Sequence, residues 1–215
     1  RGLERLFHGH GGAAALGPRH LDRRPCDGDG GLLVKTILET ARLSLREFAP
    51  EDYGALCLML RDAETMYAYE HAFSESEAHA WLQNQLDRYA KYGLGLWAVT
   101  LKATGELIGQ CGLTMQNAGE FGEVVEVGYI FRRDCWHRGY ASEAAIACRD
   151  YAFEKLGVPE VYSIIRVGNA ASENVARRNG MTPRGALMKH YYGMDMPHTI
   201  FSVRTEELSR DPGTP

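Results

Sequence analysis

The feature that most constrains this chain is a segment in which an apolar run passes through a basic, glycine-bearing turn into an alanine-rich stretch. Residues 124–131 (VVEVGYIF) are typical of a strand, and the alanine-rich pattern after the turn is typical of a helix. The turn itself falls at Arg138-Gly139. A strand that leads at once into a helix points to an α/β domain.

Such a turn is suited to binding an anion. At the first turn of a helix several backbone N–H groups lack intrahelical partners, and the helix dipole places positive potential where they point. Gly139 can adopt a positive φ or let a ligand approach the backbone, and Ala141 keeps side-chain bulk out. Arg133, His137 and Arg138 add charge that is positive or can become so. We predict a phosphate site here; an ordinary strand-turn-helix with a basic rim is the alternative.

The bulk composition excludes several classes of protein. The 215 residues carry a net charge of −4 and no long basic run, so a nucleic-acid partner is not expected. There is no stretch of about 18 consecutive apolar residues, so no membrane span is predicted. The five cysteines are scattered without Cys-x-x-Cys spacing, which favours reduced thiols in a cytoplasmic protein.

Residues 1–33 differ in kind from the rest of the chain. They are rich in glycine and arginine and can bury little apolar surface, so we expect a disordered leader or a segment foreign to the natural protein. The folded domain is expected over residues 34–208, with a short tail at 209–215. No metal is predicted, because the candidate ligands in the leader match no metal-site spacing; they are His8, His10, His20 and Cys26.

Local signals predict an alternation of strands and helices. Ser74-x-x-Glu77 is a capping-box pattern before a helix, and Gly93 is its stop. A helix from about residue 140 to 156 stands between two strands, so a β-α-β crossover with local parallel pairing is expected. The other expected elements are strands at 43–47, 96–101, 107–115, 124–131 and 161–167, helices opening at 50–52 and 169, and a final hairpin of 187–192 with 199–205.

Five segments, in this order, resemble the GNAT superfamily of acetyl-CoA-dependent N-acetyltransferases. They are ILETARLSLREF from Ile37, ELIGQCGL (106–113), EVGYIF (126–131), WHRGYASEA (136–144) and NAASENVARRNGM (169–181). The pattern is most similar to the branch that contains the ribosomal-protein-alanine N-acetyltransferases. The resemblance implies a mixed, mostly antiparallel central sheet flanked by helices, with a β-α-β core that binds acetyl-CoA.

The resemblance also implies which residues hold acetyl-CoA. The loop with Gly139, Tyr140, Ala141 and Ser142 would hold the pyrophosphate, together with the basic residues beside it. The family has Gln or Arg where this chain has Trp136, which affects side-chain contacts more than the backbone cradle.

The cofactor arm is expected to lie along the preceding strand. By the same resemblance, the main chain near Ile130 and Phe131 would pair with the pantetheine amides, and Asn169 would hydrogen-bond the arm or cap the following helix. Gly128 is a candidate β-bulge that would leave room for the arm; a plain weak point in the strand is the alternative.

Acetyl transfer to an amine needs a base, stabilisation of a tetrahedral oxyanion and a proton for the departing thiolate. Glu126 lies in an apolar strand where a carboxylate is costly, and is the first candidate to orient or deprotonate the amine; an exposed strand face is the alternative. Ser172 resembles the proton-donating serine of the ribosomal branch, or is a first-turn helix serine. Tyr191 stands where that branch has a carboxylate, and is a candidate for the acceptor pocket or for packing.

The function expected is therefore direct acetyl transfer from acetyl-CoA to a primary amine, on a protein N-terminus or a small molecule. A non-catalytic module that binds or senses acetyl-CoA is the alternative. The chain contains no Gly-x-x-x-x-Gly-Lys-Ser/Thr motif, which disfavours a nucleotide-hydrolysing enzyme. The loop around Gly139 lacks three spaced glycines, which disfavours a dinucleotide oxidoreductase. Acetyl-CoA and the amine are the expected partners, and the sequence leaves a homodimer open.

Overall fold

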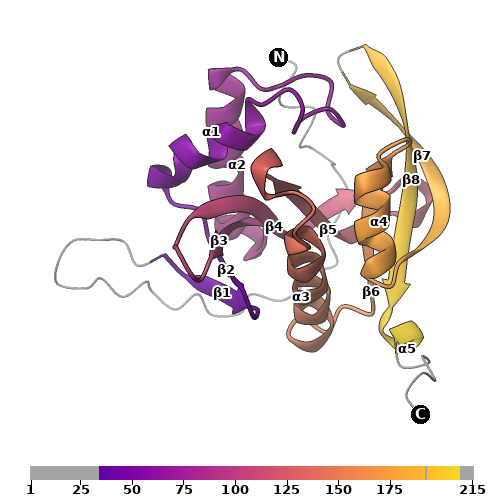
Figure 1. Cartoon of the computed structure of the whole chain (residues 1–215). Helices are drawn as coiled ribbons and strands as arrows, with labels where there is room; N and C mark the ends of the chain where they lie inside the picture. Colours follow the sequence, from indigo (N-terminus) through magenta and orange to yellow (C-terminus); the bar gives the residue numbers. More distant parts are fainter. Residues whose placement is uncertain (1–33, 192, 209–215) are drawn as a thin grey trace.

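Eight strands form one sheet in the computed structural model, which describes residues 34–191 and 193–208, apart from the side chain of residue 191 (Figure 1). The strand order is β1-β2-β3-β4-β5-β6-β8-β7. The strands are β1 (Thr36–Glu39), β2 (Leu43–Arg46), β3 (Leu96–Leu101), β4 (Leu107–Asn117), β5 (Glu123–Phe131), β6 (Glu160–Arg166), β7 (Thr182–Tyr191) and β8 (Met194–Arg204). The helices are α1 (Tyr53–Leu60), α2 (Glu75–Tyr92), α3 (Tyr140–Glu154), α4 (Ala170–Arg178) and α5 (Thr205–Leu208), with 3-10 turns η2 (Pro50–Asp52), η3 (Gly119–Phe121) and η4 (Arg133–Cys135).

The sheet is mostly antiparallel, as predicted. Only the neighbours β5 and β6 run parallel within the described part of the sheet, and α3 lies between them in the chain. The predicted β-α-β core is therefore confirmed. The predicted leader, 1–33, and tail, 209–215, lie outside the described residues.

The capping signals of α2 are confirmed. The hydroxyl of Ser74 accepts a hydrogen bond from the Glu77 amide at 3.3 Å, and the Glu77 carboxylate accepts one from the Ser74 amide at 2.8 Å. Gly93 ends the helix in the left-handed region at φ 68°, where glycine carries no Cβ penalty. No helix in the described ranges is long and apolar enough to cross a membrane.

Helices cover both faces of the sheet. Successive residues of a strand point to opposite faces. In β4, Gln110 accepts a hydrogen bond at 3.0 Å from the indole of Trp81 in α2, whereas the sulfur of Cys111 lies 3.6 Å from that of Cys148 in α3. Thus α2 packs on one face and α3 on the other, and α4 lies beside α3 (Figure 1).

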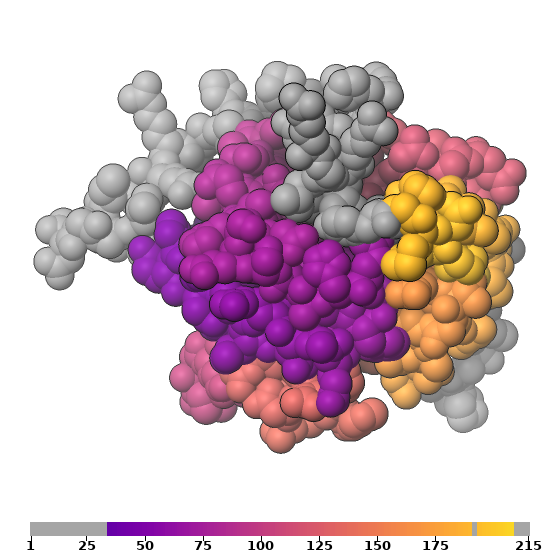
Figure 2. Space-filling model, turned by 90° about the horizontal axis from the view of Figure 1, so that it is seen from above, coloured from indigo at the N-terminus to yellow at the C-terminus, as the bar shows by residue number. Residues whose placement is uncertain are grey.

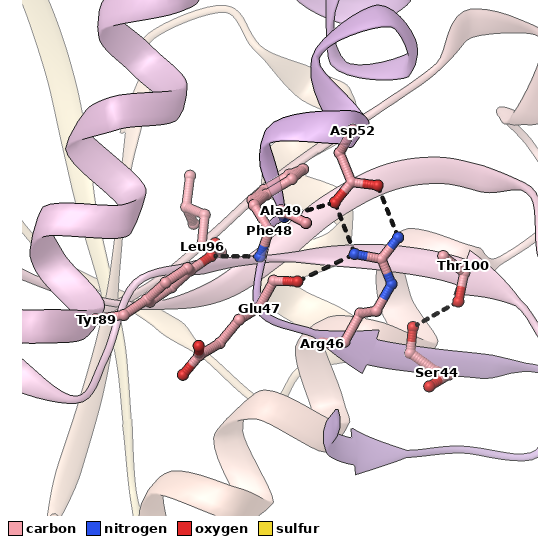
Figure 3. Close-up of polar contacts among 9 residues, drawn as sticks. All are labelled: Ser44, Arg46, Glu47, Phe48, Ala49, Asp52, Tyr89, Leu96 and Thr100. Carbon is pink, nitrogen blue, oxygen red and sulfur yellow. Dashed lines mark hydrogen bonds and ion pairs between the residues drawn. The ribbon is translucent and has the colours of Figure 1, made fainter. Parts of the chain in front are cut away.

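Polar contacts fix the start of the helical segment to the sheet (Figure 3). Arg46, the last residue of β2, makes two hydrogen bonds of 2.7 Å to the Asp52 carboxylate, which also accepts the amide of Ala49 at 2.8 Å. The Tyr89 hydroxyl of α2 accepts the Phe48 amide at 3.4 Å and donates to the carbonyl of Leu96. These bonds hold α2 against the strand ends.

The strands β5 and β6 part soon after they meet. In the described part of both strands, ladder pairing is limited to Glu126 opposite Tyr162. Beyond this point side chains replace the ladder: the Ser163 hydroxyl donates to the Val127 carbonyl at 2.9 Å, and the Ile164 amide donates to the Glu126 carboxylate at 3.2 Å. Two of the backbone groups freed by the parting, the Val127 carbonyl and the Ile164 amide, are thereby satisfied.

The β-bulge predicted at Gly128 is absent from the register of β4 and β5, whereas the predicted parting of this strand from a neighbour is found between β5 and β6. The register between β4 and β5 runs without a shift from Gly109 opposite Phe131 to Asn117 opposite Glu123. Strand β5 stays paired with β4 throughout, and the gap lies on its other side, toward β6. A glycine in a strand signals weak side-chain packing, but it does not reveal which neighbour will leave.

Ser163→Ala should lower the free energy of unfolding by about 1 to 2 kcal/mol, because the Val127 carbonyl loses its donor. Chemical denaturation would measure the change. Ser44→Ala is the matched control, since the Ser44 hydroxyl makes no hydrogen bond within the described residues. Equal stability of the two variants would contradict a role for Ser163 at the parting of the strands.

Candidate active site

The gap between β5 and β6 opens into two cavities, one on each face of the sheet. The α2-side cavity, about 240 Å³, lies among α2, the α1–α2 connection and the β7–β8 hairpin. The α3-side cavity, about 550 Å³, lies between the start of α3 and α4. Residues that line both cavities are Ala68, Tyr69, Tyr129, Ile130, Asn169 and Ser172. The two cavities therefore meet at the gap.

Backbone geometry prepares the start of α3 for a ligand. Gly139, the N-cap, has φ 81°, and no side chain caps the helix. The first intrahelical bond runs from the Glu143 amide to the Gly139 carbonyl at 3.0 Å, so the amides of Tyr140, Ala141 and Ser142 precede it. These amides lie beside the α3-side cavity, which their residues line. The turn therefore has the backbone geometry that the predicted anion cradle requires.

The acidic residue in this turn is held away from the cradle. Glu143 accepts hydrogen bonds from the Thr40 hydroxyl at 2.6 Å and from the guanidinium of Arg42 at 2.7 Å. Burial raises the pKa of the Glu143 carboxyl, but these bonds outweigh it and lower the pKa overall. Arg42 also donates to the Arg138 carbonyl at 3.0 Å and lies 4.5 Å from the ring centre of Tyr140. Sequence reasoning missed this support, because Arg42 and Glu143 are far apart in the chain.

Most of the predicted cofactor residues line the α3-side cavity. They are Ile130, Phe131, His137, Gly139, Tyr140, Ala141, Ser142 and Asn169. His137 adopts a positive φ of 59°, uncommon for a residue with a side chain, as part of the same turn. Trp136, which departs from the family pattern, donates its indole N–H to the Phe131 carbonyl at 2.8 Å and so ties the loop to the end of β5.

Two predicted basic residues lie outside that lining. The guanidinium of Arg133 is half-exposed and pairs with Glu64 at 2.6 Å and Asp62 at 3.8 Å. The backbone carbonyl of Arg138 accepts a hydrogen bond from Arg42.

Arg178, which sequence reasoning did not select, supplies a cation to the cavity from the last turn of α4. A helical-spacing argument could have found it, because the α4 residues in the lining are Ala171, Asn174, Val175 and Arg178.

Asn169 is the N-cap of α4. Its side-chain oxygen accepts a hydrogen bond from the amide of Ser172 at 3.0 Å and another from the Tyr67 hydroxyl.

Tyr67 belongs to the connection between α1 and α2, as do Asp62 and Glu64. Arg166 of β6 donates to the carbonyls of this connection at 3.4 Å. The connection therefore touches the β5 side of the gap at Arg133 and the β6 side at Asn169 and Arg166. In Figure 2 the α1–α2 region lies over the middle of the face seen from above.

Glu126 is half-buried on the α2 side, exactly opposite Thr114 in the register of β4 and β5. One carboxylate oxygen accepts the Thr114 hydroxyl at 3.3 Å and the other accepts the Ile164 amide at 3.2 Å. Arg88 of α2 interacts with it electrostatically: burial lowers the pKa of Arg88, and the charge of Glu126 opposes that effect. The carboxylate is therefore oriented by the strands on both sides of the gap, and it lines the α2-side cavity.

Ser172 lies where the two cavities meet. Its hydroxyl makes no hydrogen bond within the described ranges, while its carbonyl accepts the hydroxyl of Tyr129 at 2.9 Å. Burial raises the pKa of Tyr129, so this phenol stays protonated. Tyr129 comes from β5 and Ser172 from α4, so their bond joins the two sides of the gap.

The remaining predicted site residue, Tyr191, is the last residue of β7 and pairs with Met194 at the hairpin. Its side chain lies outside the described residues. Among the residues that the structure does describe, no group of three or more His, Cys, Asp or Glu is placed to hold a metal ion.

The comparisons with known proteins agree with this architecture. Residues 42–182 match the family model described as an acetyltransferase (GNAT) domain. The chain belongs to the GNAT family. The predicted family is thus confirmed, and the chain is an acetyltransferase.

Individual relatives cover most of the chain. It is 33% identical over 154 residues to an uncharacterized N-acetyltransferase, p20, of Bacillus licheniformis, covering 70% of this chain and 84% of that one. It is 31% identical over 191 residues to the FsC-acetyl coenzyme A-N(2)-transacetylase of Aspergillus fumigatus, covering 82% and 80%. A RimL ribosomal L7/L12 α-N-protein acetyltransferase in complex with coenzyme A shares the fold, with a TM-score of 0.66, 17% identity and coverage of 80% of this chain and 99% of that one.

Arg42→Ala should speed amide hydrogen exchange in the first turn of α3, because Glu143 and the Arg138 carbonyl lose a shared donor. Exchange of a peptide spanning residues 136–146, followed by mass spectrometry, would measure it. Arg204→Ala is the control, since Arg204 forms a similarly exposed pair with Glu160 far from this turn. Unchanged exchange in Arg42→Ala would show that the turn holds its shape alone.

Proposed function

We propose that this GNAT enzyme transfers an acetyl group from acetyl-CoA to a primary amine. The observation that carries the proposal is the pair of cavities that meet at the gap between β5 and β6. One contains the amide cradle of α3, and the other contains an oriented carboxylate. A donor and an acceptor could approach the same point from opposite faces of the sheet.

The residues of the α3-side cavity fit acetyl-CoA. The amides of Tyr140, Ala141 and Ser142 are placed for phosphate oxygens, and Gly139 at positive φ keeps a side chain away from them. Arg178 and His137 supply cationic or potentially cationic groups to the same lining. When bound, acetyl-CoA supplies an activated thioester. Relatives whose names or titles include acetyl coenzyme A or coenzyme A support this choice of donor.

Glu126 is the proposed base. A protonated amine cannot attack a carbonyl, so a group on the acceptor side must take its proton, directly or through water. Glu126 lines the α2-side cavity, and the Thr114 hydroxyl and the Ile164 amide fix its orientation. Each carboxylate oxygen can accept more than one hydrogen bond, so these contacts leave Glu126 able to accept from an amine.

Ser172 is the proposed proton donor to the leaving thiolate. Its position at the meeting point of the cavities, with a hydroxyl that has no partner in the described part of the chain, suits this role. Tyr129 and Asn169 position it by bonds to its carbonyl and its amide. Tyr191 remains a candidate for the acceptor side of the site.

We further propose that the protein works in the cytoplasm with reduced cysteines. The described cysteines are free, including the buried pair Cys111 and Cys148, whose sulfurs are 3.6 Å apart. Direct transfer needs no cysteine nucleophile, and burial raises the pKa of the Cys148 thiol, which disfavours a thiolate there.

The proposed reaction is tested by incubating the protein with acetyl-CoA and a panel of primary amines, with thiol release and product mass as readouts. Glu126→Gln should lower turnover by about 10²-fold, because an amide cannot accept the proton, while affinity for coenzyme A is retained. The Gln carbonyl can still accept the Ile164 amide, so the fold should persist.

Calorimetry with coenzyme A is the control for Glu126→Gln. Turnover within twofold of the unmodified protein, at saturating substrates, would remove Glu126 from the chemistry. Binding of acetyl-CoA without product from any amine would favour the sensing module instead.

Ser172→Ala should also lower turnover, and the loss should shrink with an acyl donor whose thiol has a lower pKa and leaves readily as an anion. Asn174→Ala is the control, because Asn174 lines the α3-side cavity but not the point where the cavities meet. An equal loss with both donors would assign Ser172 a structural role.

A further inference from the structure

A carboxylate in the α2-side cavity lacks a partner. Four buried side-chain atoms in the described residues have no hydrogen-bond partner: Glu70 Oε2, Trp97 Nε1, Gln110 Nε2 and Asn179 Oδ1. Of these four residues, only Glu70 lines a cavity. A buried carboxylate oxygen without a donor is costly, because it has lost its hydration. The other oxygen, Oε1, is accessible and also has no hydrogen-bond partner in the described residues, so a ligand that enters the cavity can donate to it.

Aromatic residues lie near Glu70 in the sequence and line the same cavity. Tyr69, Phe73 and Trp81 form an edge-to-face cluster, with ring centres 5.5 to 6.2 Å apart. All three line the α2-side cavity with Glu70. A carboxylate beside aromatic rings is a favourable setting for an ammonium group, which gains an ion pair and attraction to ring faces.

The cations near this cavity act on Glu70 only at a distance: burial raises the pKa of its carboxyl, and the charges of His71 and Arg166 oppose that effect without outweighing it. Arg166 directs its guanidinium to the backbone carbonyls of the α1–α2 connection, and His71 pairs with Glu77 at 3.0 Å. Arg88 interacts with Glu126, and Lys189 lines the cavity from β7. None of these groups forms an ion pair with Glu70 within 4 Å in the described residues. The raised pKa of Glu70 is the expected result for a carboxylate without a close donor.

We propose that Glu70 selects the acceptor by binding a second ammonium group, so that the preferred substrate is a small diamine. The inference rests on the proposed acetyl transfer. One amine of the substrate, as an ammonium ion, gives a first proton to Glu126 and forms the new C–N bond as the C–S bond of the thioester breaks. The thiolate takes a proton from Ser172, and the second proton released by the nitrogen passes to Ser172 directly or through water, so that the amide, the free thiol and the serine hydroxyl result. The other amine stays charged and donates to Glu70. A cavity of about 240 Å³ suits a molecule of this size.

The test compares 1,4-diaminobutane with 1-aminobutane, which lacks the second amine. With the unmodified protein, kcat/KM for the diamine should exceed that for the monoamine by about tenfold or more, since a charge-assisted hydrogen bond is gained. Glu70→Gln should remove most of this preference by raising KM for the diamine, with kcat and the rate with 1-aminobutane changed less than twofold. Glu70→Asp, which keeps the negative charge, should retain part of the preference for the diamine over the monoamine.

Glu75→Gln is the matched control, because Glu75 is an exposed carboxylate in the first turn of α2, outside both cavities. The melting temperature of Glu70→Gln should match or exceed that of the unmodified protein, since the Glu70 carboxylate makes no hydrogen bond to the described residues. Equal use of the two amines, or a preference that survives Glu70→Gln, would overturn the inference while leaving acetyl transfer intact. Failure of every amine, with coenzyme A still bound, would instead overturn the proposed function.

Discussion

The structure depends on how the chain satisfies the backbone groups that are freed where β5 and β6 part. Two parallel strands that separate inside a sheet expose N–H and C=O groups, which are costly when buried without partners. Here Ser163 bonds the Val127 carbonyl and Glu126 bonds the Ile164 amide. The gap is therefore a stable part of the fold, and the carboxylate that supports it also lines the α2-side cavity.

The two faces of β5 carry different residues of the candidate site. Because side chains alternate along a strand, Glu126 lies on the face of α2 and Tyr129 on the face of α3 and α4. The cavity on the first face holds carboxylates, aromatic rings and the half-buried Arg88, whereas the cavity on the second face holds the N-terminus of α3. An offset of three residues along β5 thus separates the proposed base from the phenol that contacts Ser172.

Local signals in the sequence predicted most elements, because capping residues and glycine stops act within one or two turns. The capping box at Ser74, the stop at Gly93 and the N-cap at Asn169 are examples. The start of β7 at Thr182, earlier than expected, was obscured by Pro183 and Gly185, where the register shifts. The support of Glu143 by Arg42 could not be predicted, since it depends on residues about a hundred positions apart being brought together by the sheet.

The connection between α1 and α2 has a mechanical consequence. It is bonded to Arg133 on one side of the gap and to Asn169 and Arg166 on the other. A segment that is bonded to both sides of the gap limits how far β5 and β6 can move apart, and it transmits strain from one strand to the other. A change in the width of the gap must therefore strain the contacts of this connection as well as the direct bond between Tyr129 and Ser172. Part of the resistance to opening thus comes from a short stretch of chain that belongs to neither strand.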